Sequence, residues 1–375
     1  MRFLLVVPPL TGHVTPLRAV AAALRARGHE VAWCGPEPWT SQVVGESAYP
    51  AGDSAPFAVE LRPADVRGFA ALKFLWENYL IPLADEMMPG VRAAATSFEP
   101  HVVVADQQAL AGAVVARQLG IPWATSASTS AELSEPTPNL PKIADWITGL
   151  LRELCRRYSA PVCDLRYSPS LILAFTTREL AGAPSVHLAP VVHYLGAPET
   201  EPSKVDFDWE ALDERPLVIV TLGTANAGTG QRFLGECATA LASMNEVQGV
   251  IAGTPQTPQI PQVELLQRAA AIVCHGGHNT VVESLHAGVP LVVAPIRDDQ
   301  SALAQQVVQS GAGVRIRFDR ANAGDIRQAI TWLLTRPQYA RSAARIQRSF
   351  ADAGGATEAA RLLEQEGQSC NPMSR

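Results

Sequence analysis

Short apolar runs alternate with longer amphipathic runs along most of the chain. Phe3–Val7 is continuously apolar, as expected of a strand that is buried on both faces of a parallel sheet. Thr15 and Pro16 follow as a helix cap and a first helical position, and apolar residues then recur at helical spacing over Leu17–Leu24. Glu30–Cys34 is predicted to be the next strand. This order of strand, helix and strand predicts a parallel sheet.

The alternation continues in two series, separated by a proline-rich, acidic stretch without hydrophobic periodicity. In the first series, Gln108–Leu119 is predicted to be a helix, Ala64–Phe98 to be mostly helical, and three runs to be strands: His101–Ala105, Pro122–Thr125 and Leu171–Phe175. In the second series the expected strands are Leu217–Leu222, Gly249–Ala252, Ala271–Cys274, Pro290–Ala294 and Val314–Ile316.

These patterns predict an α/β protein of two Rossmann-like, doubly wound domains with an interdomain cleft. The expected boundaries are an N-terminal domain at 1–197, a linker at 198–216 and a C-terminal domain at 217–350. A helix and a frayed tail are expected at 351–375.

Composition narrows the class of protein. Of 375 residues, 47% are hydrophobic and 18% charged, and the net charge is -6. An acidic chain argues against a protein built around nucleic acid or an anionic membrane. No apolar stretch approaches the ~20 residues that a membrane-spanning helix needs, so no stable membrane insertion is expected. The six cysteines form no C-x-x-C pair, which fits a reducing cytoplasm.

The most informative stretch runs from Cys274 to Thr280, where a strand, a glycine turn and a helix follow one another. Glycines let the backbone approach a ligand, and free N–H groups at a helix N-terminus bind phosphate without a metal. His275 could add a hydrogen-bond donor, and Glu283 could accept from ribose hydroxyls. Two alternatives remain: a plain turn with Asn279 as the cap, and a zinc site of His275 and His278, which lacks a third ligand.

The whole run from His275 to Gln300 resembles the donor-binding signature of family-one glycosyltransferases of the GT-B fold, most closely the bacterial enzymes that glycosylate natural products such as antibiotics. The features carrying the resemblance are the His-Gly motif, the glutamate, Gly288-Val289-Pro290 and Asp299-Gln300. The resemblance implies that the diphosphate, the ribose and the sugar are bound by His275, Gly277, Asn279, Thr280, Glu283, Asp299 and Gln300. It places Thr224 on the opposite wall and Gln262 in the donor site. It also implies that the domain at 1–197 binds the acceptor and that the domain at 217–350 binds the nucleotide sugar.

In the N-terminal half, Gly12-His13-Val14-Thr15-Pro16 resembles the context of the family's general base. Asp106, after the strand His101–Ala105, resembles the acid that orients it. Each residue alone is more often a loop or capping residue. Together, at the carboxyl ends of two parallel strands, they favour a catalytic dyad.

Two features depart from the family. The position of a tryptophan that stacks on the base is occupied by Gln259, and the stretch from Ala252 to Pro261 is roughly a dozen residues shorter than usual. Asp206-Phe207-Asp208 forms a D-x-D, but its acidic surroundings favour a solvated charge run over a metal site.

For a hydrophobic acceptor, the candidate residues are Phe74, Trp76 and Tyr79. Large apolar side chains suit such a pocket, and an ordinary helix face packed in a core is the equally good alternative.

The expected function is an inverting, metal-independent glycosyltransferase that moves a sugar from a UDP- or dTDP-linked donor to a hydrophobic small molecule. No cofactor is expected, since the nucleotide sugar is a co-substrate, and a homodimer is compatible with the sequence. The alternatives are a catalytically silent nucleotide-sugar-binding auxiliary protein and a nucleotide-sugar epimerase of the same fold. A nicotinamide-dependent dehydrogenase is disfavoured because Pro8-Pro9-Leu10-Thr11-Gly12 does not fit G-x-G-x-x-G.

Overall fold

The chain divides into two compact units. The computed structural model describes residues 1–58, 61, 66, 68–134, 141–198, 203, 205–223, 230–255 and 257–369. The first unit comprises Met1–Phe175, Ala183–Glu199 and Ala353–Arg375, and the second comprises Thr176–Gly182 and Thr200–Asp352.

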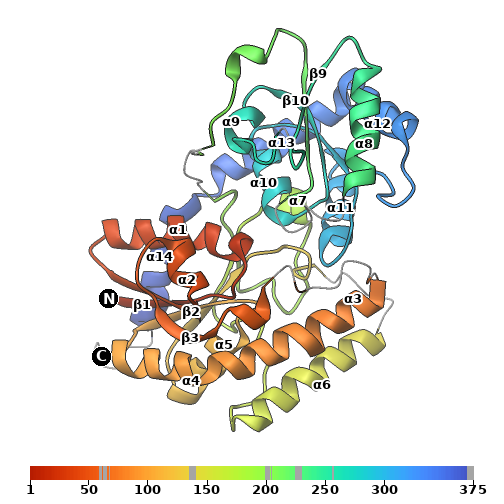
Figure 1. The fold of residues 1–375 in the computed structure, drawn as a ribbon. Helices are drawn as coiled ribbons and strands as arrows, with labels where there is room; N and C mark the ends of the chain where they lie inside the picture. Colours follow the sequence, from red (N-terminus) through yellow and green to blue (C-terminus); the bar gives the residue numbers. More distant parts are fainter. Residues whose placement is uncertain are drawn as a thin grey trace. The chain divides into compact units, whose positions relative to one another are not determined.

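The first unit is built on a seven-stranded parallel sheet of order β3-β2-β1-β4-β5-β6-β7. Figure 1 labels its strands β1, β2 and β3. Its strands are β1 (Arg2–Val6), β2 (Glu30–Glu37), β3 (Tyr49–Asp53), β4 (Val102–Asp106), β5 (Trp123–Ala127), β6 (Ile172–Ala174) and β7 (Val192–Tyr194). The chain winds outward from β1 to β3 and then resumes beside β1 with β4. The carboxyl ends of β1 and β4 therefore meet at the point where the winding reverses, which is where ligands bind in such sheets.

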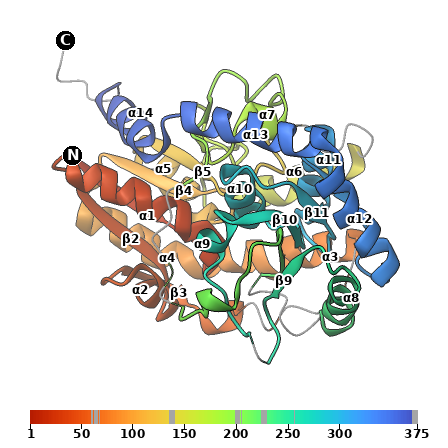
Figure 2. The same ribbon diagram turned by 90° about the horizontal axis from the view of Figure 1, so that it is seen from above.

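Helices cover both faces of this sheet. They are α1 (Thr11–Ala26), α2 (Trp39–Val44), η1 (Ala55–Phe57), α3 (Gly68–Phe74), the π-helix η3 (Leu75–Leu80), α4 (Ile81–Phe98), α5 (Leu110–Leu119), α6 (Pro141–Arg157) and α14 (Gly355–Ser369). Phe3 and Leu5 of β1 pack with α1 and α14, whereas Leu4 and Val6 pack with α4 and α5. Figures 1 and 2 show α1 and α14 side by side on one face. Burying each of these side chains contributes about 1.5–3 kcal/mol, so both faces stabilise the strand.

Ion pairs join helix α14 to the segment that follows α1. Glu364 of α14 accepts two hydrogen bonds from Arg27, at 2.7 and 2.6 Å, and one from His29 at 2.6 Å. These partners lower the pKa of Glu364 to about 2. Helix α14, although distant in sequence, thus belongs to the fold of the first unit.

The second unit holds a five-stranded parallel sheet of order β12-β11-β10-β8-β9. Its strands are β8 (Leu217–Thr221), β9 (Gln248–Ile251), β10 (Ala269–Cys274), β11 (Leu291–Val293) and β12 (Gly313–Arg315). Its helices are α7 (Arg178–Ala181), η4 (Trp209–Ala211), α8 (Gln231–Ala242), α9 (Gln262–Leu266), α10 (His278–His286), α11 (Gln300–Gln309), α12 (Ala323–Thr335) and α13 (Pro337–Asp352). The winding reverses between β8 and β10, so the loops after these two strands meet.

The prediction of two doubly wound parallel sheets is confirmed, and several details differ. The strands β3 and β7 and the helices α2 and α6 were not predicted. Strand β3 contains Pro50 and Gly52, which are tolerated because it is an edge strand.

The predicted start of the first helix at Thr15 is wrong, because α1 begins at Thr11. Pro16 lies inside the helix and removes one backbone donor, and Thr15 Oγ1 donates to Thr11 O at 3.0 Å within the same turn. As a result His13 lies in the first helical turn and not in a loop.

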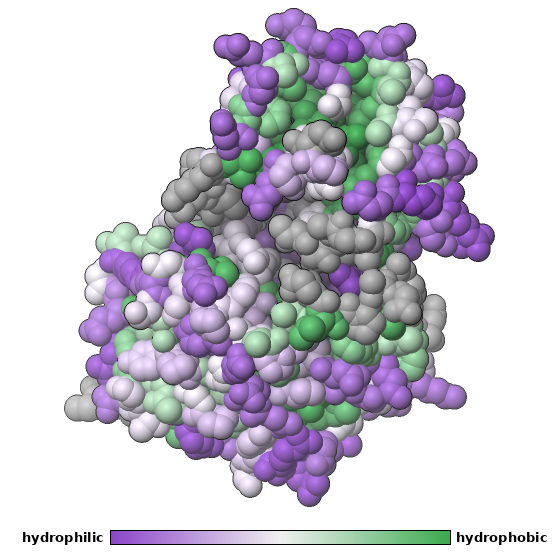
Figure 3. Space-filling view, in the orientation of Figure 1, coloured by the Kyte–Doolittle hydropathy of each residue, from purple (hydrophilic) through white to green (hydrophobic). Residues whose placement is uncertain are grey.

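A groove of about 1220 Å³ runs along β9, the edge strand of the second sheet. Its apolar lining comes from the segment before β8, from α8 and from β9, and includes Phe207, Leu212, Leu241 and Val250. Figure 3 shows hydrophobic atoms gathered on this part of the second unit.

Candidate active site

The predicted pair of His13 and Asp106 forms in the first unit. His13 Nδ1 lies 2.9 Å from Asp106 Oδ1. The strand register explains the contact: Val6 of β1 pairs with Ala105 of β4, so the first turn of α1 lies beside the end of β4. The Asp106 side chain is fully buried, and 16% of the His13 side chain is exposed. A carboxylate at this distance fixes the ring and favours the proton on Nδ1, which leaves Nε2 as the basic nitrogen.

Asp106 is itself held in place. Its Oδ1 also accepts a hydrogen bond from the backbone N–H of Gln108 at 2.8 Å. Its Oδ2 is buried and has no hydrogen-bond partner in the described part of the chain. The carboxylate therefore directs one oxygen to two donors, one of which is the imidazole.

The sequence interpretation missed a third residue, Ser128. Its Oγ lies 2.6 Å from the same His13 Nδ1. Ser128 follows directly after β5, which neighbours β4 in the sheet. A signal was present in the sequence: a run of hydroxyl side chains, Thr125, Ser126, Ser128, Thr129 and Ser130, covers the carboxyl end of this strand.

In the second unit, the predicted glycine turn connects β10 to α10. Gly277 is the N-cap residue of α10, so Asn279 and Thr280 lie in its first turn, as predicted. The N–H groups of a first helical turn lack helical partners and carry the positive end of the helix dipole. This terminus can therefore hold an anion such as a diphosphate.

His275 is packed between two glycines. A Cβ atom at Gly277 would lie 2.4 Å from His275 Nε2, and one at Gly223 would lie 2.8 Å from His275 Cε1. Burial, with a smaller contribution from Arg297, lowers the pKa of His275 to about 4. The ring is thus neutral at pH 7, and its buried Nδ1 has no hydrogen-bond partner among the described residues. A ligand that bonded to Nδ1 would remove a desolvation penalty of about 1–3 kcal/mol.

Glu283 and Gln262 lie together. Gln262 Nε2 donates a hydrogen bond to Glu283 Oε2 at 2.6 Å. Burial raises the pKa of Glu283 to about 7, although the bond from Gln262 acts in the opposite direction. Gln262 and Glu283 were both predicted as donor-site residues, and the structure joins them by a hydrogen bond that the sequence did not predict.

Asp299 and Gln300 begin α11. Asp299 is its N-cap residue and makes no side-chain capping bond. Gln300 Oε1 accepts from the backbone N–H groups of Ile296 and Arg297, at 2.8 and 3.0 Å. One end of the Gln300 amide thus closes the loop before α11.

Three other predicted features have different outcomes. Thr224 lies outside the described residues. In Asp206-Phe207-Asp208, Asp208 caps η4 by accepting from Glu210 and Ala211. Within the described ranges, no three His, Cys, Asp or Glu side chains are grouped as metal ligands, and this includes the neighbourhood of His275 and His278.

The acceptor candidates lie in α3 and η3. Trp76 and Tyr79 are buried in the core of the first unit, at 1% and 3% exposure, and Phe74 is half-buried. For Trp76 and Tyr79, this placement matches the alternative of a helix face packed in the core.

Comparison with known proteins supports the assignment of the fold and of the enzyme class. Residues 239–365 match the family described as erythromycin biosynthesis protein CIII-like, C-terminal domain. The 4'-demethylrebeccamycin synthase of Lentzea aerocolonigenes is 28% identical, over 97% of this chain and 99% of that protein. The glycosyltransferase of kitacinnamycin has the same fold, with a TM-score of 0.81 at 22% identity, over 97% of this chain and 98% of that one.

The chain is a GT-B glycosyltransferase. The resemblance noted from the His275–Gln300 motif to the enzymes of antibiotic biosynthesis is confirmed. None of the described helices of this glycosyltransferase is long and apolar enough to cross a membrane.

Replacing Gly277 with Ala should weaken binding of a nucleoside diphosphate by about tenfold or more. The backbone at Gly277 (φ -64, ψ 142) suits any residue, so the expected defect arises from displacement of the His275 ring. Isothermal titration with UDP and dTDP measures it. Gly235→Ala in α8 is the matched control, because a Cβ there meets nothing within 4 Å. Equal affinities for the two variants would contradict the role given to His275.

Binding of an intact nucleotide sugar should strengthen as the pH rises from about 6 to about 8. Glu283, whose pKa is about 7, becomes a carboxylate over this interval and then accepts more strongly from ribose hydroxyls. The diphosphate diester of a nucleotide sugar does not titrate in this range. In Glu283→Gln the pH dependence should disappear and affinity should fall. A pH dependence that persists in the variant would assign it to another group.

Proposed function

We propose that this glycosyltransferase is inverting and metal-independent, and that it transfers a sugar from a UDP- or dTDP-linked donor to a hydrophobic natural-product acceptor. His13 is the general base and Asp106 supports it. The observation that carries the proposal is the 2.9 Å contact between His13 Nδ1 and the buried Asp106 Oδ1. It leaves Nε2, on the opposite side of the ring, free to take a proton.

In the proposed step, an acceptor hydroxyl attacks the anomeric carbon of the sugar. A bond forms between the acceptor oxygen and the anomeric carbon while the bond from that carbon to the diphosphate breaks. The electron pair leaves with the diphosphate, and the acceptor proton moves to His13 Nε2. The imidazolium that results is stabilised by Asp106, as in other His–carboxylate pairs.

The departing diphosphate gains negative charge and needs fixed donors. The N-terminus of α10 supplies backbone N–H groups, and the neutral His275 ring adds one nitrogen. Donors that are already oriented stabilise developing charge without reorganisation. This is why no metal is invoked.

The relatives suggest the class of donor to test first. The spinosyn rhamnosyltransferase has been solved with thymidine diphosphate, and it matches 97% of this chain and all of that one with a TM-score of 0.75 at 21% identity. A panel of UDP- and dTDP-sugars read by thermal shift should separate a true donor. A ligand at a hundredfold Kd stabilises a protein by about 2.7 kcal/mol.

Turnover then separates the alternatives. Transfer of the sugar to an acceptor supports the glycosyltransferase activity proposed. Binding without turnover would favour the auxiliary protein, and interconversion of the sugar without an acceptor would favour the epimerase.

His13→Ala should lower turnover with a hydroxyl acceptor by about 10²–10⁴ and leave donor affinity unchanged. The donor-site residues are held by the sheet and helices of the second unit, whereas His13 belongs to the first. Asp106→Asn should lose a comparable or smaller factor, because it removes the orienting group and not the base. Steady-state kinetics and donor titration measure the two quantities. Full turnover in His13→Ala with an unchanged melting curve would exclude His13 as the base.

Removal of metal ions should leave donor binding and turnover intact. We expect this because the α10 terminus and His275 supply the donors that a metal would otherwise replace. The measurement is turnover after dialysis against EDTA, with and without added Mg²⁺. Loss of activity that Mg²⁺ restores would contradict this part of the proposal.

A further inference from the structure

His13 Nδ1 has two partners and can donate only one proton. Asp106 Oδ1 lies at 2.9 Å and Ser128 Oγ at 2.6 Å. A carboxylate offers only lone pairs, so a proton must lie on Nδ1 for the contact with Asp106 to be attractive. Ser128 Oγ then faces the same N–H as a second acceptor. The contact with Asp106 fixes the tautomer in which Nε2 is basic, and Ser128 can accept from the same N–H.

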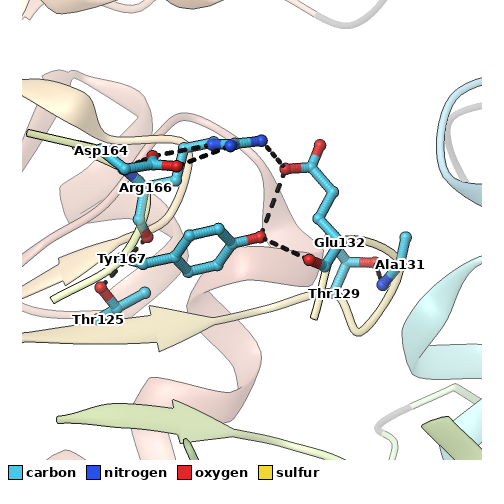
Figure 4. Close-up of polar contacts among 7 residues, drawn as sticks. All are labelled: Thr125, Thr129, Ala131, Glu132, Asp164, Arg166 and Tyr167. Carbon is cyan, nitrogen blue, oxygen red and sulfur yellow. Dashed lines mark hydrogen bonds and ion pairs between the residues drawn. The ribbon is translucent and has the colours of Figure 1, made fainter. Parts of the chain in front are cut away.

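The loop that carries Ser128 is fixed at its far end. Tyr167 O–H donates to the backbone oxygen of Glu132 at 3.2 Å, and Glu132 Oε2 accepts from Arg166 Nη1 at 2.7 Å (Figure 4). Within the loop, Thr129 Oγ1 accepts from the N–H of Ala131 at 3.3 Å. The segment between Ser128 and Glu132 is thus held at one end by this cluster and at the other by the pairing of Ala127 in β5 with Ala174 in β6.

The cluster that holds Glu132 has several further contacts, and Tyr167 is its buried member. Arg166 donates to both carboxylate oxygens of Asp164, at 2.9 and 2.7 Å. Its guanidinium lies 5.2 Å from the ring centre of Tyr167 and 5.9 Å from that of Trp76. Burial raises the pKa of Tyr167 well above its ordinary value, so its hydroxyl remains a donor. Trp76, offered above as an acceptor residue, here supports the arginine.

We propose that Ser128 is a positioning residue for His13, and that the cluster of Glu132, Arg166 and Tyr167 holds Ser128 in place. The inference rests on the proposed role of His13 as general base. It assigns a task to four residues that the family signature does not include.

Loss of the Ser128 hydroxyl should lower turnover and leave substrate binding unchanged. When Nε2 takes the acceptor proton, the ring becomes a cation and the N–H at Nδ1 is bonded more strongly by its acceptors. Removing one of two acceptors should therefore lower kcat by about tenfold and leave KM for the donor and acceptor close to wild type.

The test compares Ser128→Ala with Ser126→Ala. Ser126 lies in β5, two residues earlier, and is also buried, but its Oγ has no hydrogen-bond partner in the described part of the chain. We expect the loss of kcat for Ser128→Ala alone, with melting curves and donor affinities that agree between the two variants. A general effect of deleting a buried hydroxyl would appear in both.

A double-mutant cycle tests the link to the cluster. Tyr167→Phe removes the bond to the Glu132 backbone and should lower kcat by a smaller factor than Ser128→Ala. If Tyr167 acts through Ser128, its substitution should have no further effect on kcat in the Ser128→Ala background. Independent, multiplicative losses would overturn the link between Tyr167 and Ser128.

The His13→Ala variant separates this inference from the proposed function. If His13→Ala loses turnover while Ser128→Ala matches Ser126→Ala, the role of Ser128 is wrong and the general base stands. If His13→Ala keeps full turnover, the proposed mechanism fails and the role of Ser128 fails with it.

Discussion

The contact between His13 and Asp106 depends on one constraint, the register of two parallel strands. Val6 pairs with Ala105, and this pairing fixes where the first turn of α1 stands relative to the end of β4. A shift by one residue would turn Asp106 to the other face of the sheet. The second unit obeys the same constraint: Cys274 pairs with Thr221, so His275 stands beside Gly223. Both groups of candidate residues thus occupy the reversal point of a doubly wound sheet.

Burial of ionisable side chains has different electrostatic consequences in the two units. In the first unit, Asp106 is fully buried and is bonded by an imidazole and a backbone N–H, so its charge is directed at one ring nitrogen. In the second unit, burial lowers the pKa of His275 and raises that of Glu283, so both side chains lean toward their neutral forms. Positive potential at this site then comes from the helix terminus of α10 and from Arg297, which acts on His275. The negative charge at this site would come from the incoming diphosphate.

The sequence predicted those features that local patterns determine. Continuous apolar runs predicted β1, β4, β8 and β10, and the resemblance to the family's motifs predicted His13, Asp106 and the His275 turn. The start of α1 was missed because Pro16 resembled a first-turn proline. Ser128 and the bond from Gln262 to Glu283 were missed for another reason. They depend on the directions in which a hydroxyl and an amide point once β5 and α9 have packed. Neither hydrophobic periodicity nor motif spacing predicts those directions.

The His-Gly motif is recognisable in the sequence because its geometry leaves few alternatives. Gly276 adopts φ +88, which L side chains rarely adopt, and a Cβ there would lie 2.7 Å from Val293 Cγ1. Gly277 and Gly223 must lack side chains for the His275 ring to fit between them. The histidine is therefore the only bulky side chain of the turn, and the glycines around it are a consequence of its position. By contrast, Ser128 needs only a hydroxyl at the right distance, a requirement that imposes no pattern on its neighbours.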